Sequence, residues 1–486
     1  MFMNFQQISL RITEVLILFI STVVTVKAEK RLDSLKYGPF EQIQLYHPEG
    51  KPESLVLFVS GDGGWNEGVI QMAKSLATEG AMVAGIDIRH YLKSLYRQKL
   101  SCFYPAADFE RLSLMLQKKF HFPAYQKPVL VGYSSGATLV YAMLVQAPAN
   151  TFKGALSLGF CPDLKTWKQL CEGAGLKSHK MKAAGTFFIE KAAKLSAPFI
   201  VLNGITDQVC PYEATKEFLS GMVEAELITL SKVGHGFSVH SNWMPQFMDA
   251  YKKILQAPSF TQVQESKNEV LKRKRLDPLP GDMPLSVIPT VVKSDAPLVF
   301  MISGDGGWTS FDQSLAEALA GKKLTVIGLD AQKYFWNEKT PRETSSDVSK
   351  AVLHYLQQYQ KESFILAGYS FGASVVPFIA SRLNEQLKQK LIGVVSLSPE
   401  VTADFEIHVA DMLGVAGSGE DYDVLREEQK IKAFHPICYF GQQEDAETAE
   451  LFKKAGIKVG MIPGSHHFDN NYSLIASRIS DFLDVK

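Results

Sequence analysis

The sequence predicts an α/β protein made of two tandem domains, each with a doubly wound, mostly parallel sheet. The first observation is an internal repeat: the hexapeptide Ser-Gly-Asp-Gly-Gly-Trp occupies residues 60–65 and again 303–308. The second is the length, because 486 residues exceed what one hydrophobic core usually supports. The third is that short apolar runs alternate with longer segments of helical period, which indicates parallel strands buried on both faces and joined by helical crossovers.

The expected strands follow the same order in both halves. In the first half the apolar runs are residues 55–59, 82–86, 129–131, 155–158 and 199–202. In the second half they are residues 298–302, 324–329, 364–367, 393–397 and 437–440. A longer stretch lies between the fourth and fifth runs of each half, at 160–197 and 398–435, and we expect each to form a small cap beside a functional site.

The N-terminus has the features of a secretory signal. Arg11 precedes the apolar stretch 15–26, and Val26 and Ala28 are small residues at the positions a signal peptidase inspects. The stretch is too short to span a bilayer. We therefore expect removal of residues 1–28, followed by a first domain at 29–260, a linker at 261–293 and a second domain at 294–486.

The charge is balanced, with 51 basic and 51 acidic residues, so no bulk attraction to nucleic acid is expected. One dense basic run, Lys272 to Arg275, lies in the linker. A solvated linker is the preferred interpretation of this run, and contact with an anionic membrane surface is the alternative.

Cysteine spacing favours disulfides over a metal site. Cys102, Cys161, Cys171 and Cys210 all lie in the first half, where an even number permits pairing in an exported chain. Cys438 lies in an apolar run and is expected to be a buried thiol. No Cys-x-x-Cys or His-x-x-x-His spacing supports a metal, and the glycine-rich hexapeptide lacks the P-loop ending and the dinucleotide spacing, so no cofactor is expected.

Each half also carries a Gly-x-Ser-x-Gly pentapeptide, at residues 132–136 and 368–372. Both follow an apolar run and precede a segment of helical character. This context suits a nucleophile elbow, a strained turn that lifts a serine hydroxyl clear of the sheet. Two such pentapeptides in register within a repeat are much stronger evidence than one, and they make Ser134 and Ser370 the candidate nucleophiles.

A serine nucleophile needs a histidine base, and that histidine needs a carboxylate that orients it. In this architecture the chain order is serine, acid, histidine. The first half supplies Ser134, Asp207 and His235 in that order.

The second half leaves alternatives at two positions. The base is His466 or His467, and counting back from the following phenylalanine favours His466. The acid is Glu444 or Asp445; counting forward from Gly441 places Glu444 opposite Asp207, but the shorter carboxylate matches the first half. We therefore predict Ser370, His466 and, by a narrow preference, Asp445.

The shared hexapeptide follows the first expected strand of each half, where this architecture places an oxyanion donor. Its glycines let the backbone approach a substrate carbonyl closely. The expected oxyanion donors are the backbone N–H groups of Asp305 and Phe371 in the second half, and those of Asp62 and Ser135 in the first.

These residues resemble the AcvB/VirJ family of bacterial virulence proteins, whose members have the α/β-hydrolase fold and are exported. The resemblance rests on residues 303–308, on Gly368 to Ala373 running into Val375-Val376-Pro377-Phe378, and on His466-His467-Phe468-Asp469. The double-length layout is similar to that of AcvB, whereas VirJ resembles the second half alone. The first half departs from the pattern, because it lacks the proline after its pentapeptide and the second histidine.

The resemblance implies a periplasmic serine esterase that hydrolyses the aminoacyl ester of aminoacylated, such as lysyl-, phosphatidylglycerol at the membrane surface. For VirJ-like members it also implies an association with type IV secretion. On this basis the second half does the chemistry. Because the first half retains Ser134, Asp207 and His235 in the right order, we expect it to hold a secondary site. Two alternatives stay open: a general carboxylesterase or lipase, and a non-catalytic periplasmic adaptor of a secretion machine.

Two further groups of residues bear on the substrate. Glu343, Asp347 and Glu400 are acidic residues near the second elbow that would suit a substrate ammonium group, although solvation or helix capping is their ordinary role. The aromatic run 334–336 suits an acyl pocket or the core, and the core is preferred.

Overall fold

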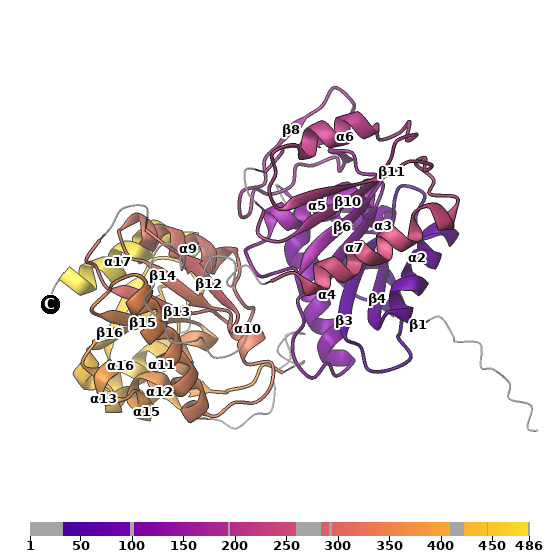
Figure 1. Cartoon of the computed structure of the whole chain (residues 1–486). Coiled ribbons are helices and arrows are strands. Elements are labelled where there is room, and N and C mark those ends of the chain that lie inside the picture. The colour runs from indigo at the N-terminus through magenta and orange to yellow at the C-terminus, as the bar shows by residue number, and fades with distance from the viewer. Residues whose placement is uncertain are drawn as a thin grey trace, which may run out of the picture.

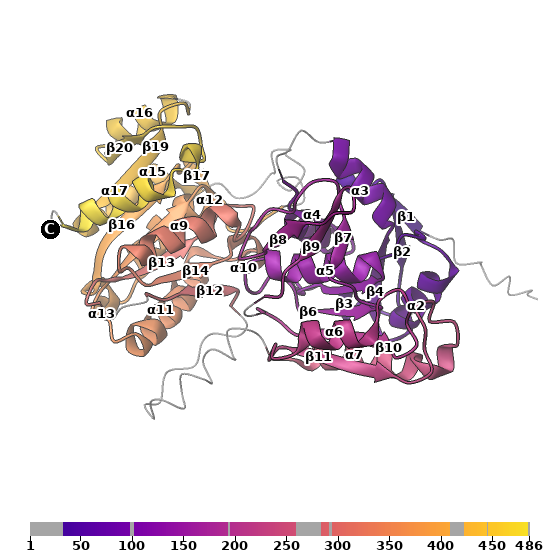
Figure 2. The same cartoon turned by 90° about the horizontal axis from the view of Figure 1, so that it is seen from above.

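The computed structural model describes residues 33–97, 102–192, 195–258, 283–290, 294–408, 422–444 and 446–484. They form two α/β units that lie side by side (Figures 1 and 2). Each unit is a mostly parallel sheet covered by helices on both faces, so the predicted fold class is confirmed. The expected export signal, the basic run 272–275 and Asp445 lie outside the described residues.

The first sheet has eight strands, of which those from β4 to β11 in the spatial order are parallel. The antiparallel strands β1 and β2 extend it at one edge. In spatial order the strands are β1 (Asp33–Lys36), β2 (Gln42–Tyr46), β4 (Ala81–Ile86), β3 (Ser54–Val59), β5 (Val129–Tyr133), β6 (Gly154–Leu158), β10 (Phe199–Gly204) and β11 (Ala225–Leu230).

The second sheet has seven strands and repeats this order. Its antiparallel edge strand, β12, pairs with β14, and the remaining strands are parallel. In spatial order they are β12 (Leu285–Ile288), β14 (Val326–Leu329), β13 (Leu298–Ile302), β15 (Phe364–Tyr369), β16 (Leu391–Leu397), β19 (Pro436–Gly441) and β20 (Lys458–Ile462). The expected linker therefore ends earlier than predicted, because part of it, β12, belongs to the second sheet.

The helices of the first unit divide between the two faces of its sheet. Alternate residues of β3 show the division: Leu55 and Leu57 join one buried cluster and Val56 and Phe58 the other. Helices α2 (Glu67–Thr78) and α7 (Met244–Gln256) cover one face. Helices α3 (Ile88–Arg97), α4 (Pro105–Lys119), α5 (Ser135–Gln146) and α6 (Tyr212–Leu219) cover the other, and short 3-10 turns lie at Gly38–Phe40 and His240–Asn242.

The second unit divides its helices in the same way. Helices α9 (Ser310–Gly321) and α17 (Tyr472–Asp484) pack on one face. The other face carries α10 (Ala331–Tyr334), α11 (Pro341–Gln358), α12 (Phe371–Arg382), α13 (Glu385–Lys388), α15 (Val424–Lys430) and α16 (Ala446–Lys454). Short 3-10 turns lie at Lys432–Phe434 and Phe468–Asn470.

Small additional strands lie in the stretches that the sequence assigns to caps. The first stretch forms a three-stranded antiparallel sheet of β7 (Asp163–Lys165), β9 (Thr186–Ile189) and β8 (Ser178–Lys180). The second forms the short pair β17 (Thr402–Ala403) and β18 (Tyr422–Asp423).

The two units contact each other through opposite ends of their sheets. The second unit contributes α10 and the residues after it, which follow the carboxyl end of β14. Trp336 Nε1 donates to the carbonyl oxygen of Phe122 at 3.2 Å, and Asn337 Nδ2 to that of Pro123 at 2.9 Å. Phe122 and Pro123 precede β5, so the first unit is contacted near the amino ends of its strands. The preference for the aromatic run 334–336 as buried residues is confirmed, since Phe335 and Trp336 are 0% and 3% exposed.

A buried charge cluster lies at the same contact. Lys333 Nζ is 2.7 Å from Asp330 Oδ2 of its own unit and 2.7 Å from Glu110 Oε1 on α4 of the first unit. The side chains of Lys333 and Asp330 are each 6% exposed. This cluster ties α10 and its N-cap residue to the first unit.

The expected disulfides are present and lie in the first unit. Cys102 is bonded to Cys171 and Cys161 to Cys210, while Cys438 is a buried free thiol, as predicted. Among the described residues, no helix has both the length and the apolar character that crossing a bilayer requires.

Candidate active site

Both candidate nucleophiles lie on a sharp turn between a strand and a helix. Ser370, between β15 and α12, has φ 52° and ψ −116°. Ser134, between β5 and α5, has φ 54° and ψ −121°. This backbone conformation is strained for a residue with a side chain. Small neighbours permit it: a Cβ atom on Gly372 or on Gly136 would lie 2.3 Å from a carbonyl oxygen of β13 or β3. Both turns therefore have the geometry of a nucleophile elbow.

The first unit brings its three predicted residues together. His235 Nε2 lies 2.9 Å from Ser134 Oγ, and His235 Nδ1 lies 2.9 Å from Asp207 Oδ2. The Asp207 side chain is fully buried, and its second oxygen accepts hydrogen bonds from the backbone N–H groups of Val209 and Cys210 at 2.9 and 2.8 Å. The acid is thus held by its own turn, and the disulfide of Cys210 to Cys161 ties that turn to the segment after β6.

The second unit assembles an equivalent triad. His466 Nε2 lies 3.0 Å from Ser370 Oγ, and His466 Nδ1 lies 2.6 Å from Glu444 Oε1. His467, the alternative base, instead packs edge-on against Phe311, with ring centroids 5.8 Å apart. His466 is therefore the base that reaches the nucleophile.

The narrow preference for Asp445 as the orienting acid is corrected to Glu444. Glu444 is the third residue after Gly441, as Asp207 is the third after Gly204, so the register of the turn was the better guide. The longer side chain is accommodated because its other oxygen, Oε2, moves to different donors: Ser398 Oγ at 2.8 Å and the backbone N–H of Gly441 at 2.5 Å.

Ser398 is a functional residue that the sequence analysis missed. It follows β16 with φ 52°, and the equivalent residue after β6 is Gly159 with φ 62°. A Cβ atom at Gly159 would lie 3.1 Å from His235, so a serine there would crowd the base of the first unit. The signal in the sequence was a residue with a side chain where the other copy has glycine.

The predicted oxyanion loops lie beside the elbows. A Cβ atom on Gly304 would lie 3.5 Å from the Cβ of Ser370, and one on Gly61 would lie 2.8 Å from that of Ser134. Within the described ranges, no carbonyl or side chain accepts a hydrogen bond from the backbone N–H of Asp305 or Phe371. Asp62 and Ser135 occupy the equivalent positions in the first unit. These N–H groups are therefore placed beside the serines and left free for a substrate oxygen.

Electrostatics at the second triad favour a protonated histidine. The hydrogen bond to Glu444 raises the pKa of His466; desolvation opposes it, and the charges of Glu444, Glu400 and Asp305 raise it further. Burial alone would raise the pKa of Glu444, but hydrogen bonds from His466, Gly441 and Ser398 outweigh it and lower that pKa. Two carboxylates outside the triad, on Glu400 and Asp305, thus contribute negative potential at the base.

The other acidic residues near the second elbow have structural partners. Glu343 closes a capping box at the start of α11, where its carboxylate accepts from Thr340 N at 2.9 Å and from Thr340 Oγ1 at 2.8 Å. Asp347 accepts a hydrogen bond from Tyr334 Oη at 2.9 Å. Of the three candidates for an ammonium partner, Glu400 is the one whose charge acts on the triad.

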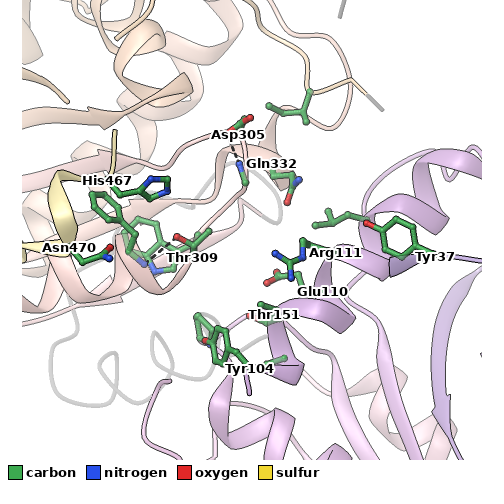
Figure 3. Close-up of a pocket in the computed structure, with 18 residues that line it drawn as sticks. Tyr37, Tyr104, Glu110, Arg111, Thr151, Asp305, Thr309, Gln332, His467 and Asn470 are labelled. Carbon is green, nitrogen blue, oxygen red and sulfur yellow. Dashed lines mark hydrogen bonds between the residues drawn. The ribbon is translucent and has the colours of Figure 1, made fainter. Parts of the chain in front are cut away.

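A cavity of about 460 Å³ lies between the two units, next to the second triad. Asp305 and His467 contribute to its wall from the second unit, and Tyr104 and Arg111 from α4 and the residue before it in the first (Figure 3). Asp305 belongs to the predicted oxyanion loop and His467 is the residue after the base, so the cavity adjoins two segments of the second site. The first unit therefore forms part of the wall of a cavity beside the predicted oxyanion loop of the second unit.

The arrangement suits acyl transfer through a covalent serine intermediate. In each unit a histidine can take the serine proton, a buried or half-buried carboxylate can stabilise the imidazolium, and two N–H groups can bind the oxyanion. Among the described residues, no group of three or more His, Cys, Asp or Glu side chains is arranged to hold a metal ion.

Several solved structures are similar to part of this chain. They include a thermophilic esterase from Thermogutta terrifontis (17% identity, TM-score 0.34, covering 46% of this chain and 91% of that one). Est1E from Butyrivibrio proteoclasticus has 12% identity and a TM-score of 0.31, with 46% and 99% covered. An alpha-beta serine hydrolase homologue from Coxiella burnetii has 16% identity and a TM-score of 0.30, with 46% and 96% covered. A comparison with curated proteins gives no significant match.

A family described as "Bacterial virulence protein (VirJ)" matches residues 53–158 and 296–486. These segments make up more than half of the 486 residues. The second segment contains Ser370, Glu444 and His466, whereas the first ends before Asp207 and His235. The chain belongs to the VirJ family of bacterial virulence proteins.

Proposed function

We propose that this protein is a periplasmic serine esterase that hydrolyses the aminoacyl ester of aminoacylated phosphatidylglycerol at its second unit. Ser370 is the nucleophile, His466 the base and Glu444 the orienting acid. Ser370 Oγ attacks the ester carbonyl while its proton passes to His466 Nε2, which then protonates the leaving glycerol oxygen. Phosphatidylglycerol leaves at this step. Water, deprotonated by His466, then hydrolyses the aminoacyl-serine ester, which releases the free amino acid and restores the Ser370 hydroxyl.

The observation that carries the proposal is the pair of carboxylates outside the triad. Glu400 and Asp305 both raise the pKa of His466, so negative potential extends over the reacting centre. An aminoacyl ester has an ammonium group on the carbon next to the ester carbonyl, and a lysyl ester has a second one. Carboxylates close to the base therefore favour this acyl group over the neutral acyl chain of an ordinary lipid ester.

The cavity between the units suits the anionic remainder of the substrate. Arg111 lines it from the first unit, opposite Asp305 (Figure 3). Its guanidinium makes an ion pair with Asp108 at 2.6 Å, but the side chain remains 66% exposed. A guanidinium retains donors for a phosphodiester when one of its N–H groups is occupied. We place the lipid phosphate beside Arg111.

Compartment and cysteine chemistry agree with this proposal. Two disulfides suit an oxidising compartment such as the periplasm, and the apolar N-terminal stretch 15–26 has the features of an export signal. Lipid headgroups of the outer leaflet are within reach there.

Two measurements test the proposed function. Purified protein is expected to release lysine, and no fatty acid, from vesicles that contain lysyl-phosphatidylglycerol. Cells that make this lipid are expected to accumulate it when the gene is removed. Release of fatty acid instead would identify a general lipase. Failure of a fluorophosphonate to label Ser370, with unchanged lipid levels in cells, would leave the adaptor alternative.

The pH dependence of the second site follows from the raised pKa of His466. The base must be neutral to accept the serine proton, so kcat/KM is expected to rise with pH through a midpoint above the ordinary histidine value of about 6.5. Glu400→Gln removes one neighbouring negative charge, so this midpoint is expected to move to lower pH. The measurement is kcat/KM against pH for a soluble lysine ester, in a Ser134→Ala background. An unchanged midpoint would contradict the role given to Glu400.

Binding of the lipid phosphate is tested at Arg111. Arg111→Gln is expected to raise KM for lysyl-phosphatidylglycerol vesicles about tenfold, because a close unit charge pair at a protein surface contributes on that order. The kcat value and the hydrolysis of a soluble lysine ester are expected to stay near wild type. Arg97→Gln is the matched control, since Arg97 is an exposed arginine of the first unit that pairs with Glu41. Equal effects of both variants would mean general attraction to the vesicle surface.

A further inference from the structure

The triad of the first unit is complete, although the proposed function does not use it. Its histidine lies 2.9 Å from both the serine and the acid. The family match ends before Asp207 and His235. Decay into a scaffold would not preserve a strained serine, a buried aspartate and a bridging histidine together.

The two sites can be compared residue by residue because the same hydrogen bonds recur. Ser60 Oγ accepts from the backbone N–H of Ile88 at 3.2 Å, and Ser303 Oγ accepts from that of Ala331 at 2.9 Å. The residue after each of these donors is therefore equivalent: Arg89 in the first unit and Gln332 in the second.

Arg89 and Gln332 also lie over the same glycine of the shared hexapeptide. A Cβ atom on Gly64 would lie 1.9 Å from Arg89 Nη2, and one on Gly307 would lie 3.2 Å from Gln332 Oε1. Gln332 lines the cavity between the units, together with Asp305 of the predicted oxyanion loop (Figure 3). By this equivalence, Arg89 lies over the hexapeptide loop of the first unit, and that loop adjoins Ser134.

Arg89 is held firmly at this position. Its Nε and Nη2 atoms donate to the two oxygens of Asp87 at 3.1 and 2.7 Å, while its side chain remains 54% exposed. Burial alone would raise the pKa of Asp87, but hydrogen bonds from Arg89 and from the backbone of Trp65 and Arg89 outweigh it and lower the pKa to about 2. The pair therefore stays charged across the physiological pH range, with an exposed guanidinium edge.

A second position also makes the first site less negative than the second site. After β16 the second unit has Ser398, Pro399 and Glu400; after β6 the first has Gly159, Phe160 and Cys161. The alignment is fixed by Ser398 N donating to the Tyr439 carbonyl at 2.7 Å, as Gly159 N donates to that of Leu202 at 3.0 Å. A neutral disulfide thus replaces the carboxylate that acts on His466.

We propose that the first unit is a second ester-hydrolysing site, with Ser134, His235 and Asp207 as its triad, and that it selects esters carrying a carboxylate or phosphate near the ester bond through Arg89. Ser134 Oγ bonds to the carbonyl carbon, its proton passes through His235 Nε2 to the leaving alkoxide, and water then releases the acid. The second site has the opposite charge preference.

The experiment uses full-length Ser370→Ala protein and three 4-nitrophenyl esters of equal chain length. The adipate monoester is anionic, the hexanoate ester neutral and the 6-aminohexanoate ester cationic. We expect kcat/KM to fall in that order, by about tenfold between adipate and hexanoate. Adding Ser134→Ala is expected to abolish turnover of all three. Turnover that persists in the double variant would overturn the proposal. So would the Ser370→Ala protein showing neither turnover nor fluorophosphonate labelling of Ser134.

Arg89→Gln places in the first unit the residue type that the second unit has at the equivalent position, Gln332. It tests the preference for anionic esters separately from the hydrolysis itself. It is expected to remove the tenfold preference for adipate, and retained fluorophosphonate labelling of Ser134 reports that the unit is folded. Arg89→Lys is expected to keep most of the preference, and Arg97→Gln, on the same helix, all of it. A preference for adipate that persists in Arg89→Gln would show that another group selects the anion. If the adipate ester is hydrolysed as expected but wild-type protein does not hydrolyse lysyl-phosphatidylglycerol, the proposed function of the second unit is wrong and the proposal for the first unit stands.

Discussion

Ser370→Ala is expected to lower lysyl-phosphatidylglycerol hydrolysis by about 10⁵- to 10⁶-fold, because loss of a triad nucleophile removes the covalent path altogether. The serine hydroxyl lies 3.0 Å from His466 Nε2, and an alanine side chain offers no nucleophilic atom in its place. The measurement is lysine release from vesicles under single-turnover conditions. The fold is expected to be unaffected, since alanine keeps the Cβ atom at the strained position.

Ser134→Ala is the matched control for this experiment, because it makes the same change at the same backbone conformation, φ 54° against φ 52°. Lipid hydrolysis is expected to stay close to wild type. If Ser134→Ala abolishes lipid hydrolysis and Ser370→Ala leaves it intact, the assignment of lipid chemistry to the second unit is inverted.

Glu444→Gln is expected to lower kcat of the second site by about 10⁴-fold, the effect typical of replacing a triad carboxylate by an amide. The carboxylate accepts from His466 Nδ1 at 2.6 Å and from Ser398 Oγ at 2.8 Å. A glutamine amide that donates to Nδ1 would leave the histidine in the wrong tautomer, with its proton on the nitrogen that must face Ser370.

Asp445→Asn is the adjacent control. It removes a carboxylate one residue away and is expected to change kcat little. A loss of activity in Asp445→Asn that matched the loss in Glu444→Gln would reopen the choice between the two acids.

The stability of the fold gives an independent measurement of the Glu444–His466 contact. The pKa of His466 is raised in the folded protein, so its protonated form stabilises the fold below pH about 6.5. This contribution is lost as the pH rises through the folded pKa. In Glu444→Gln this dependence is expected to weaken.

The central strands and the triad order could be predicted from the sequence because each rests on a strong local signal. Buried parallel strands such as β3 and β13 are continuous apolar runs. The edge strands β11 and β20 were missed because they are partly exposed and mix polar with apolar residues. The antiparallel β12 was assigned to the linker for the same reason: only two of its four residues are buried.

The acid of the second triad shows where sequence reasoning was insufficient. Two adjacent carboxylates differ by one methylene group, and the choice depends on what the second oxygen of each can contact. That contact is Ser398, which follows a different strand 46 residues earlier in the chain. Similarly, the position of Arg111 beside the second site depends on how the two units dock, which no motif of either unit encodes.

The Lys333 cluster has a consequence for how the duplicated chain diverged. A buried set of ions adds little net binding energy, but removing one partner leaves the other charges buried without a counter-charge. Lys333, Asp330 and Glu110 therefore specify one docking orientation of the units more than they strengthen the contact. The aspartate is common to both copies. Asp87 pairs with a cation two residues later, inside its own unit, whereas Asp330 pairs with a cation three residues later that crosses to Glu110. The cation that pairs with this aspartate is thus Arg89 at the proposed substrate site of the first unit, and Lys333, one position further along the chain, at the contact between the two units.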